Sequence, residues 1–436
     1  MKKSILIIGL ITGFAGYLPG ADTLNLKLVP DRDVLRRGSP QEMIVKIDLS
    51  AIAQKQKSRR TPLNIAVVLD RSGSMTGAKI EKAKQAAIQL VDRLASDDVF
   101  SLVTYSDNSE VLVSAQRVED KAGLKRRISR IEPGGSTALY SGVKTGAAQI
   151  EEYISAKRIN RVMLLSDGLA NIGPSSTRDL RGLGHQLAQK GIAVTTIGVG
   201  DDYNEDLMAG LAEASDANYY YVKDTEKLPE IFAKELGELQ TVAAREIIIE
   251  IICPDGVKPI GFVARTEKFE NRKATVKLSQ FTIGQNRSLF FRCLVKNEAP
   301  EVARVKVRYV DELDGGNEQS VSEVVRVRFT DDETLAAKSV NAAVQAENEL
   351  LMTAIAKDEA LAEADAGNYA DAAKKLAVQA DALKAQYQNA SPSVRIQISN
   401  ETDNLLFRSK EFSDGKYSPS SRKALQWESY GTRNSK

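Results

Sequence analysis

The chain has 436 residues, of which 42% are apolar, so it can bury a sizeable core and is expected to form two or three domains. Its 60 basic and 58 acidic residues leave a formal charge of only +2, which supplies no strong field for nucleic acid or an anionic membrane. Two cysteines and one histidine exclude a disulfide scaffold, a four-cysteine zinc site and a two-histidine metal centre.

The N-terminus has the order of segments that is typical of a secretory signal. Met1-Lys2-Lys3 precedes an apolar stretch from Ile5 to Leu18, and small residues follow from Pro19. Because the apolar stretch is short for a membrane span, we expect a signal peptide over residues 1–21, with an uncleaved anchor as the alternative. No later stretch is apolar enough to cross a bilayer. The mature chain is therefore expected to lack a membrane span and to be exported, either periplasmic or extracellular.

Residues 22–60 contain two stretches of roughly alternating apolar residues, Leu24 to Val29 and Met43 to Leu49, which predict β-strands. Two strands do not form a stable domain alone, so we expect them to join a sheet made by a later part of the chain. The polar segment Gln54 to Arg60 fits a domain boundary.

Between residues 61 and 240, apolar strands alternate with amphipathic helices, which predicts an α/β fold with a doubly wound, mainly parallel sheet. The expected strands are Leu63 to Leu69, Val99 to Tyr105, Val111 to Val113, Val162 to Leu165, Ala193 to Val199 and Tyr219 to Val222. The expected helices are Lys79 to Leu94, Leu124 to Ile131, Ala138 to Tyr153, Thr177 to Gln189, Glu205 to Ala214 and Glu226 to Leu239.

The turn after the first of these strands carries three oxygen-bearing side chains at alternate positions, Asp70, Ser72 and Ser74. Open α/β sheets bind ligands at the carboxyl ends of their strands, and a carboxylate with two hydroxyls suits a magnesium-like cation. Taken alone, these residues are explained equally well by helix capping.

Two further oxygen-rich turns are expected at the same edge of the sheet. Thr137 lies in a glycine-rich turn that opens a helix, and Asp167 follows the strand that ends at Leu165. Capping or turn formation explains each of these residues separately. Their occurrence together with the first turn in one α/β block favours cation binding.

With these three turns, residues 61–240 resemble the von Willebrand factor type A domain family. The metal-ion-dependent adhesion site of that family consists of an Asp-x-Ser-x-Ser turn, a threonine from a second loop and an aspartate from a third. In this sequence the matching residues are Asp70, Ser72, Ser74, Thr137 and Asp167. The resemblance implies a six-stranded sheet with one short antiparallel edge strand, which we place at Val111 to Val113.

The resemblance also implies how the site would work. Ser72, Ser74 and Thr137 would bind Mg²⁺ directly, with Mn²⁺ or Ca²⁺ as alternatives, and the two aspartates would act directly or through water. The open coordination position would take an acidic side chain of a partner protein. Candidate residues for the surrounding rim, chosen by sequence adjacency, are Arg71, Met75, Tyr140, Leu169 and Asn171.

Enzymatic functions find little support in the sequence. His185, the only histidine, lies in a predicted helix, and no phosphate-binding or dinucleotide-binding glycine motif follows a strand. We therefore expect a non-enzymatic, adhesion-type binding module. The alternative is a scaffolding or assembly subunit of a cell-envelope complex, in which the metal is mainly structural. The sequence leaves the oligomeric state open.

Residues 241–331 return to an alternating pattern without helices, which predicts a β-sandwich. Asp314-Gly315-Gly316-Asn317 is a hairpin turn signal, and the two N-terminal strands are expected to complete the sandwich, so that the α/β domain is inserted into it. Cys253 and Cys293 fall on apolar strand faces, and the sequence leaves open whether they form a disulfide or remain free thiols.

Residues 332–390 are alanine-rich and predict a helical hairpin whose two segments separate at Ala366-Gly367-Asn368. We interpret this pair as packing on the sandwich rather than as a separate peptide-binding site, because a single hairpin is not a repeat array. Residues 391–436 are polar and basic and are expected to form a tail that is partly ordered at most. Trp427 in this tail is interpreted as a docking anchor or a local clasp.

Overall fold

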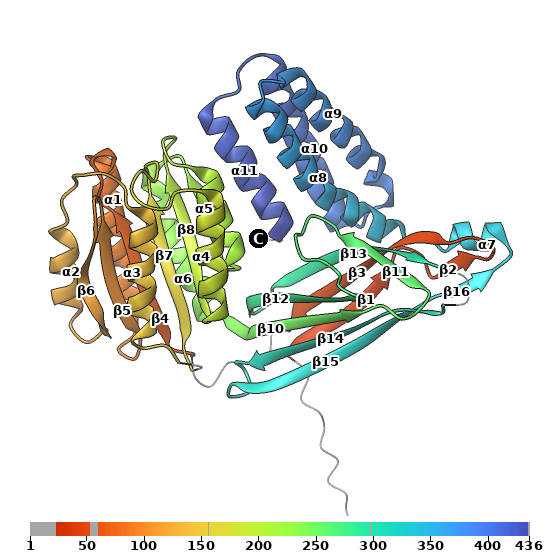
Figure 1. Ribbon diagram of the computed structural model, residues 1–436, viewed down its shortest axis with the longest axis horizontal. Coiled ribbons are helices and arrows are strands. Elements are labelled where there is room, and N and C mark those ends of the chain that lie inside the picture. Colours follow the sequence, from red (N-terminus) through yellow and green to blue (C-terminus); the bar gives the residue numbers. More distant parts are fainter. Residues whose placement is uncertain (1–22, 53–59, 156, 297–298, 435–436) are drawn as a thin grey trace, which may run out of the picture.

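The structure is a computed structural model that describes residues 23–52, 60–155, 157–296 and 299–434. These residues form an α/β unit, a β-sandwich and a group of C-terminal helices (Figure 1). The predicted signal peptide, residues 1–21, lies outside the described residues. In the ranges that the structure covers, none of the helices has both the length and the apolar character of a membrane span.

The α/β unit is built on a six-stranded sheet with the strand order β6-β5-β4-β7-β8-β9. Its strands are β4 (Leu63–Asp70), β5 (Val99–Tyr105), β6 (Ser109–Arg117), β7 (Ile159–Ser166), β8 (Ile192–Val199) and β9 (Tyr219–Val222). All neighbouring pairs are parallel except β5 and β6. The predicted doubly wound sheet with an antiparallel edge strand is therefore confirmed. The edge strand is longer than Val111 to Val113 because its exposed polar ends pair through the backbone and leave no apolar pattern.

Helices cover both faces of this sheet, which explains why residues 65–69 of β4 form an unbroken apolar run. Ile65, Val67 and Leu69 lie in one core with α1, α2 and α6, whereas Ala66 and Val68 lie in a second core with α3, α4 and α5. The helices are α1 (Ala78–Arg93), α2 (Lys121–Ser129), α3 (Leu139–Glu151), α4 (Thr177–Gln189), α5 (Glu205–Ala214) and α6 (Leu228–Gln240).

The sandwich consists of two four-stranded sheets with the strand orders β1-β3-β13-β11 and β12-β10-β14-β15. Its strands are β1 (Leu24–Pro30), β3 (Gln41–Ala51), β10 (Val242–Ile252), β11 (Val257–Phe262), β12 (Lys273–Thr282), β13 (Asn286–Val295), β14 (Glu301–Asp311) and β15 (Asn317–Arg326). Strand β3 pairs with β13 from Gln41↔Val295 to Ser50↔Asn286. The N-terminal strands thus complete the sandwich, and the α/β unit is inserted between β3 and β10, as predicted.

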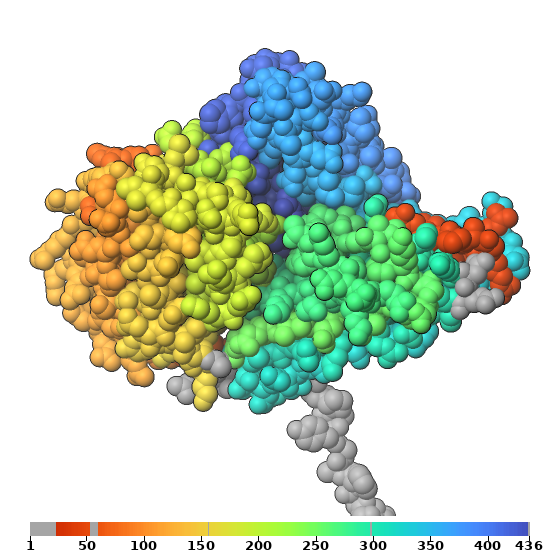
Figure 2. Space-filling model, in the orientation of Figure 1, coloured from red at the N-terminus to blue at the C-terminus, as the bar shows by residue number. Residues whose placement is uncertain are grey.

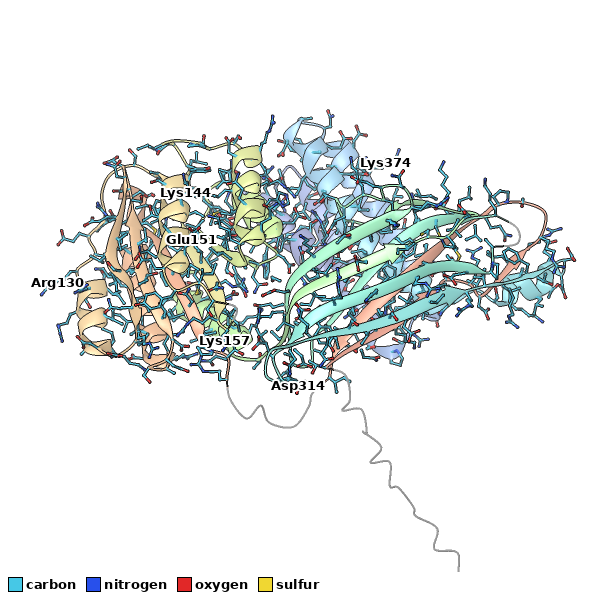
Figure 3. All side chains as sticks on the ribbon, turned by 60° about the horizontal axis from the view of Figure 1, so that its bottom comes forward. Arg130, Lys144, Glu151, Lys157, Asp314 and Lys374 are labelled. Carbon is cyan, nitrogen blue, oxygen red and sulfur yellow. The ribbon has the colours of Figure 1, made fainter. Side chains whose placement is uncertain are left out.

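The hairpin between β14 and β15 turns at the predicted Asp314-Gly315-Gly316-Asn317 segment, where both glycines have positive φ. Asp314 lies at the end of the sandwich nearest the α/β unit (Figure 3). Cys253 and Cys293 are both buried in the sandwich core and are free thiols in the structure. Burial raises the pKa of the Cys253 thiol to about 12.

Two strands, β2 (Val34–Arg36) and β11, were not predicted from the sequence, whereas β16 (Arg328–Thr330) overlaps the end of a single strand predicted over Val321 to Phe329. Strand β11 contains Pro259 and Gly261, which weaken the strand pattern, and it lies at the edge of its sheet where proline is tolerated. Strands β2 and β16 are three residues each and pair only with each other. Such strands are too short to show a period.

The C-terminal helices are α7 (Glu333–Lys338), α8 (Ala342–Asp365), α9 (Tyr369–Ala385), α10 (Pro392–Ser413) and α11 (Pro419–Asn434). The helical hairpin is present, but the prediction of a tail that is partly ordered at most was wrong, because residues 392–434 form two long helices. Ile398, Leu405 and Phe412 recur every seventh residue on α10 and are buried against α8 and α9. A stripe this narrow leaves most of the helix polar, so its apolar pattern in the sequence is weak.

Helix α11 lies between the α/β unit and the other C-terminal helices, and its C-terminal end reaches the angle between the α/β unit and the sandwich (Figures 1 and 2). Arg422 binds Glu205 at 2.6 Å and Asp206 at 3.0 Å on α5, and it also binds Asp365 at 2.6 Å on α8. Tyr430 is buried against the α/β unit, with its ring centroid 5.7 Å from that of Tyr219. Arg287 of β13 also donates to the Asn434 carbonyl at 3.4 Å, so helix α11 contacts all three units.

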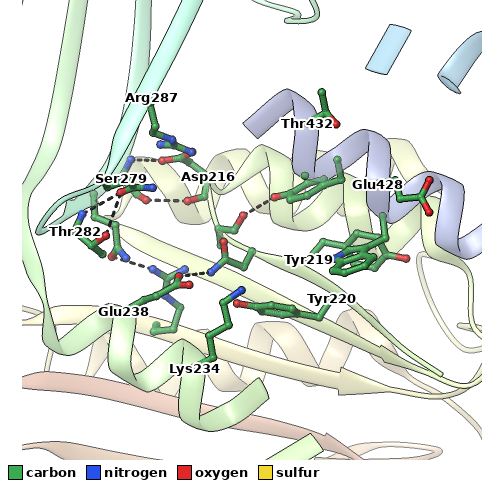
Figure 4. A pocket seen from close by; sticks show the side chains of 18 of the residues that line it. Asp216, Tyr219, Tyr220, Lys234, Glu238, Ser279, Thr282, Arg287, Glu428 and Thr432 are labelled. Carbon is green, nitrogen blue, oxygen red and sulfur yellow. Dashed lines mark hydrogen bonds and ion pairs between the residues drawn. The ribbon is translucent and has the colours of Figure 1, made fainter. Parts of the chain in front are cut away.

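A cavity of about 550 Å³ lies where the three units meet (Figure 4). In its wall, Arg287 binds Asp216 Oδ1 at 3.1 Å, and the Ser279 hydroxyl donates to the Asp216 carbonyl at 2.8 Å. Lys234 extends over the ring of Tyr220, 5.6 Å from its centroid. Many polar groups that line this cavity are hydrogen-bonded to one another, so the cavity is part of a polar interface between the three units.

Candidate functional site

The five residues predicted to form a cation site come together at the carboxyl edge of the central sheet. Asp70 is the last residue of β4 and Asp167 follows the last residue of the neighbouring strand β7, with Leu69 paired to Leu165. Thr137 directly precedes α3, whose N-cap is Ala138. Parallel strands end at the same edge, so residues that are far apart in sequence meet here.

Three backbone hydrogen bonds join the turn after β4 to its neighbours. The amide of Arg71 donates to the carbonyl of Tyr105 at 2.9 Å, and the amide of Gly73 donates to the carbonyl of Gly135 at 3.0 Å. In return, the amide of Gly134 donates to the carbonyl of Arg71 at 2.6 Å. Gly135 has a φ of 86°, and a Cβ there would lie 2.7 Å from Asp107 Oδ2. Glycine is therefore required where the two loops meet.

The three hydroxyl groups surround Gly168. Ser72 Oγ and Ser74 Oγ are 3.1 Å apart. A Cβ placed on Gly168 would lie 3.2 Å from Thr137 Oγ1, 3.3 Å from Ser74 Oγ and 3.9 Å from Ser72 Oγ. The absence of a side chain at residue 168 thus leaves room among the hydroxyl groups.

The carboxylate of Asp70 is fully buried beneath this hydroxyl group cluster. Its Oδ1 accepts a hydrogen bond from the Ser72 amide at 2.8 Å, and its Oδ2 accepts one from the Ser166 hydroxyl at 2.8 Å. Burial raises the pKa of Asp70 above its usual value, and the hydrogen bonds from Ser72 and Ser166 partly offset that rise. Asp70 therefore orients the turn that carries the two serines.

The carboxylate of Asp167 is equally buried but bridges two different groups. Ser74 Oγ donates to its Oδ1 at 2.7 Å, and Lys79 Nζ donates to its Oδ2 at 2.6 Å. Lys79 lies in the first turn of α1, and we did not predict it as part of the site. The sequence does contain one sign of its role: a basic residue stands at a helix N-terminus, where the helix dipole disfavours a positive charge.

The five residues predicted for the rim have different environments. Leu169 is 59% exposed and Asn171 is exposed, although Asn171 Oδ1 also accepts a hydrogen bond from the Thr137 amide at 2.9 Å. Arg71 and Tyr140 are half-buried. Met75 is fully buried in the core with α1, so its prediction as a rim residue was wrong.

The donor atoms of this cluster fit a hard divalent cation. Three hydroxyl and two carboxylate groups offer only oxygen ligands, as Mg²⁺ prefers. Among the described residues, no three His, Cys, Asp or Glu side chains meet in a metal-binding arrangement, so a cation here depends on the hydroxyl groups. Ser74 is exposed while Ser72 and Thr137 are buried, so the cluster opens to solvent at Ser74.

Comparisons with known proteins agree with the fold of the α/β unit. Residues 64–234 match the von Willebrand factor type A domain family. The structure of a von Willebrand factor type A protein from Catenulispora acidiphila superposes with a TM-score of 0.72 at 17% identity, covering 89% of each chain. The ArnB paralog VWA2 from Sulfolobus acidocaldarius superposes with a TM-score of 0.64 at 18% identity, covering 94% of this chain and 98% of that one. These likenesses show the fold.

Sequence relatives are also found among curated proteins. An uncharacterized protein of Synechocystis sp. is 28% identical over 309 residues, covering 67% of this chain and 72% of that protein. The uncharacterized protein YfbK of Escherichia coli is 24% identical over 274 residues, which span 47% of its length. Mouse inter-alpha-trypsin inhibitor heavy chain H2 is 29% identical over 160 residues, only 17% of its length. The α/β unit thus has the fold of a von Willebrand factor type A domain, and it is joined to a sandwich and helices.

Proposed function

We propose that this chain is a non-enzymatic binding protein that recognises an acidic side chain of a partner protein through Mg²⁺. The ion would be held by Asp70, Ser72, Ser74, Thr137 and Asp167. The observation that supports this most strongly is that three hydroxyl groups gather next to Gly168 and that the turn carrying two of them is hydrogen-bonded to two buried carboxylates. Mn²⁺ and Ca²⁺ are the alternative ions for the same oxygen ligands.

The charges at the site support an anionic ligand. Asp70 is engaged by the Ser72 amide and the Ser166 hydroxyl, and Asp167 is engaged by Lys79. Hydroxyl groups are neutral donors, so a cation held by them keeps most of its positive charge. A carboxylate that reaches the solvent-exposed side, near Ser74, would complete the coordination of the ion.

A single carboxylate on one metal ion gives weak binding, so the rim must supply the remaining affinity and specificity. The exposed side chain of Leu169 stands next to the hydroxyl cluster in sequence and offers an apolar contact. Arg71 and Tyr140 are half-buried and offer a positive charge and an aromatic ring. The partner is accordingly expected to present an acidic residue beside an apolar one.

Hydrolysis is not part of the proposal, because the cluster lacks a base. His185 lies on the exposed surface of α4 rather than at the sheet edge. Both carboxylates at the site are buried and already accept hydrogen bonds from protein groups. Neither is therefore proposed as the general base that would deprotonate an attacking water. A protein with this arrangement is suited to holding a ligand, and an export signal would place it in the periplasm or outside the cell.

A scaffolding role is the second candidate function, and the surface of α10 favours it. Ile396 and Phe407 are 65% and 58% exposed and lie 11 residues apart, which places them on the same side of the helix. This apolar strip is remote in sequence from the hydroxyl cluster. In a scaffolding protein, partner binding would depend on the strip and would tolerate removal of Mg²⁺.

Crosslinked capture from cell extracts distinguishes the two functions. The wild type, Asp70→Ala and the double variant Ile396→Ser/Phe407→Ser are each used with Mg²⁺ and with EDTA. We expect a partner that is captured by the wild type and by the α10 variant in Mg²⁺, but by neither protein in EDTA and not by Asp70→Ala. Equal capture by wild type and Asp70→Ala would rule out the hydroxyl cluster as the recognition surface.

A further inference from the structure

Lys79 places a positive charge inside a site that is proposed to hold a cation. Its Nζ lies 2.6 Å from Asp167 Oδ2, and its side chain is 26% exposed against none for Asp167. The contact is therefore shielded from water on the side of the carboxylate. Charge interactions in such surroundings are stronger than on an open surface.

The path of the side chain holds the ammonium group in place. Gly200, in the turn after β8, has a φ of 72°, and a Cβ there would lie 3.6 Å from both Cε and Nζ of Lys79. The lysine thus runs between the turn after β8 and the carboxylate of Asp167. Position 79 is in the first turn of α1, where the dipole disfavours a cation, so the contact with Asp167 is what stabilises the lysine there.

The balance of charge follows from these contacts. Asp70 and Asp167 bring two carboxylates to the site, and the ammonium group of Lys79 contacts one of them, Asp167. Lys79 cancels one of the two charges before any metal binds. With a divalent ion bound, the site would carry one excess positive charge, whereas without Lys79 it would be neutral.

We propose that Lys79 is a specificity-determining residue that weakens the binding of Mg²⁺ alone and makes an anionic ligand necessary for tight binding of the ion. This inference rests on the proposed function, because it concerns the same ion and the same carboxylate ligand. The metal and the partner's carboxylate then bind cooperatively, and each raises the affinity of the other by the same factor. A protein of this kind holds its ion firmly only when it is in contact with its partner.

The test measures Mg²⁺ binding by calorimetry to the metal-stripped full chain, first with Mg²⁺ alone and then with acetate added at constant ionic strength. Lys79→Met removes the charge and keeps the length of the side chain, and Lys79→Gln serves as a second variant that can still donate to Asp167. Lys82→Met is the matched control, because Lys82 lies one turn further along α1, is 27% exposed and pairs with Glu226 at 2.6 Å.

We expect both Lys79 variants to bind Mg²⁺ alone at least tenfold more tightly than wild type, with Lys82→Met unchanged. Acetate is expected to raise the Mg²⁺ affinity of the wild type and to have a smaller effect on the Lys79 variants. Melting curves in EDTA show whether each variant is folded. If wild type and Lys79 variants bind Mg²⁺ equally, the inference about Lys79 is wrong while the metal site stands. If the wild type binds no divalent ion, the proposed function fails as well.

Discussion

The space at Gly168 gives a sharp test of the hydroxyl cluster. Gly168→Ala adds one methyl group at the point where Thr137 Oγ1 and Ser74 Oγ would lie 3.2 Å and 3.3 Å away. The φ of Gly168 is outside the left-handed region, so alanine does not strain the backbone. The substitution therefore acts on the centre of the cluster and leaves its charges unchanged.

Two magnitudes follow from this geometry. The close contacts of the added methyl group are expected to lower the free energy of unfolding in EDTA by about 1 kcal/mol, at the lower end of the usual cost of overpacking. The wild type should gain about 2.7 kcal/mol from Mg²⁺ at a concentration of about 100 times its Kd. Gly168→Ala should lose nearly all of that gain, because its methyl group occupies the space among the ligands.

The assay is urea and thermal unfolding of each protein with Mg²⁺ and with EDTA. Gly182→Ala is the matched control, since Gly182 lies within α4 and no heavy atom comes within 4 Å of an added Cβ. The control is expected to gain about 0.5–1 kcal/mol from its helix propensity and to respond to Mg²⁺ as the wild type does. If Gly168→Ala kept the full stabilisation by Mg²⁺, the ion would not bind among these hydroxyl groups.

Further predictions concern Asp70 and helix α11. Burial raises the pKa of Asp70, so in EDTA its ionisation costs stability, and the wild type should become less stable as the pH rises from the usual value of 3.8 through the raised pKa. Asp70→Asn should not lose stability over this pH range, and in EDTA at pH 7 it should melt at a higher temperature than the wild type. It should also no longer be stabilised by Mg²⁺. A melting temperature below that of the wild type in EDTA would contradict the reasoning. Tyr430→Ala removes a ring that is 4% exposed and packs on Tyr219, at a cost of about 3–5 kcal/mol. Faster hydrogen exchange along α11 is the expected readout, and exchange at the wild-type rate would show that this helix is held elsewhere.

The sequence predicts the parts of the molecule that rest on strong local patterns. Strand β4 is fully buried on both faces, so its apolar run and the turn that follows could be read directly. The heptad stripe at Ile398, Leu405 and Phe412 was missed because a helix that is mostly polar resembles an exposed tail. Strand β11 was missed because Pro259 and Gly261 mask its pattern, and its pairing with β13 supplies what the local sequence lacks.

The candidate site also contains residues that the sequence predicts and residues that it does not. Its five oxygen-bearing residues share a motif, and the sheet topology predicts that their loops meet. Lys79 contacts Asp167 across 88 positions of sequence, and no local pattern contains that information. Met75 is adjacent in sequence to the site but is buried in the core, because successive side chains of the short helical turn Gly73–Met75 point in different directions. Sequence proximity is thus a poor guide to the rim.

The proposal depends above all on binding of Mg²⁺ by the hydroxyl cluster, and calorimetric titration of Mg²⁺ into metal-stripped wild type and Thr137→Val measures it. Valine keeps the branched shape of this buried side chain and replaces its hydroxyl group with a methyl group, which cannot bind a cation. We predict one Mg²⁺ site in the wild type and at least tenfold weaker binding in Thr137→Val, with both proteins folded in EDTA. Equal Mg²⁺ affinities of the two proteins, or no binding by the wild type, would contradict the proposed site.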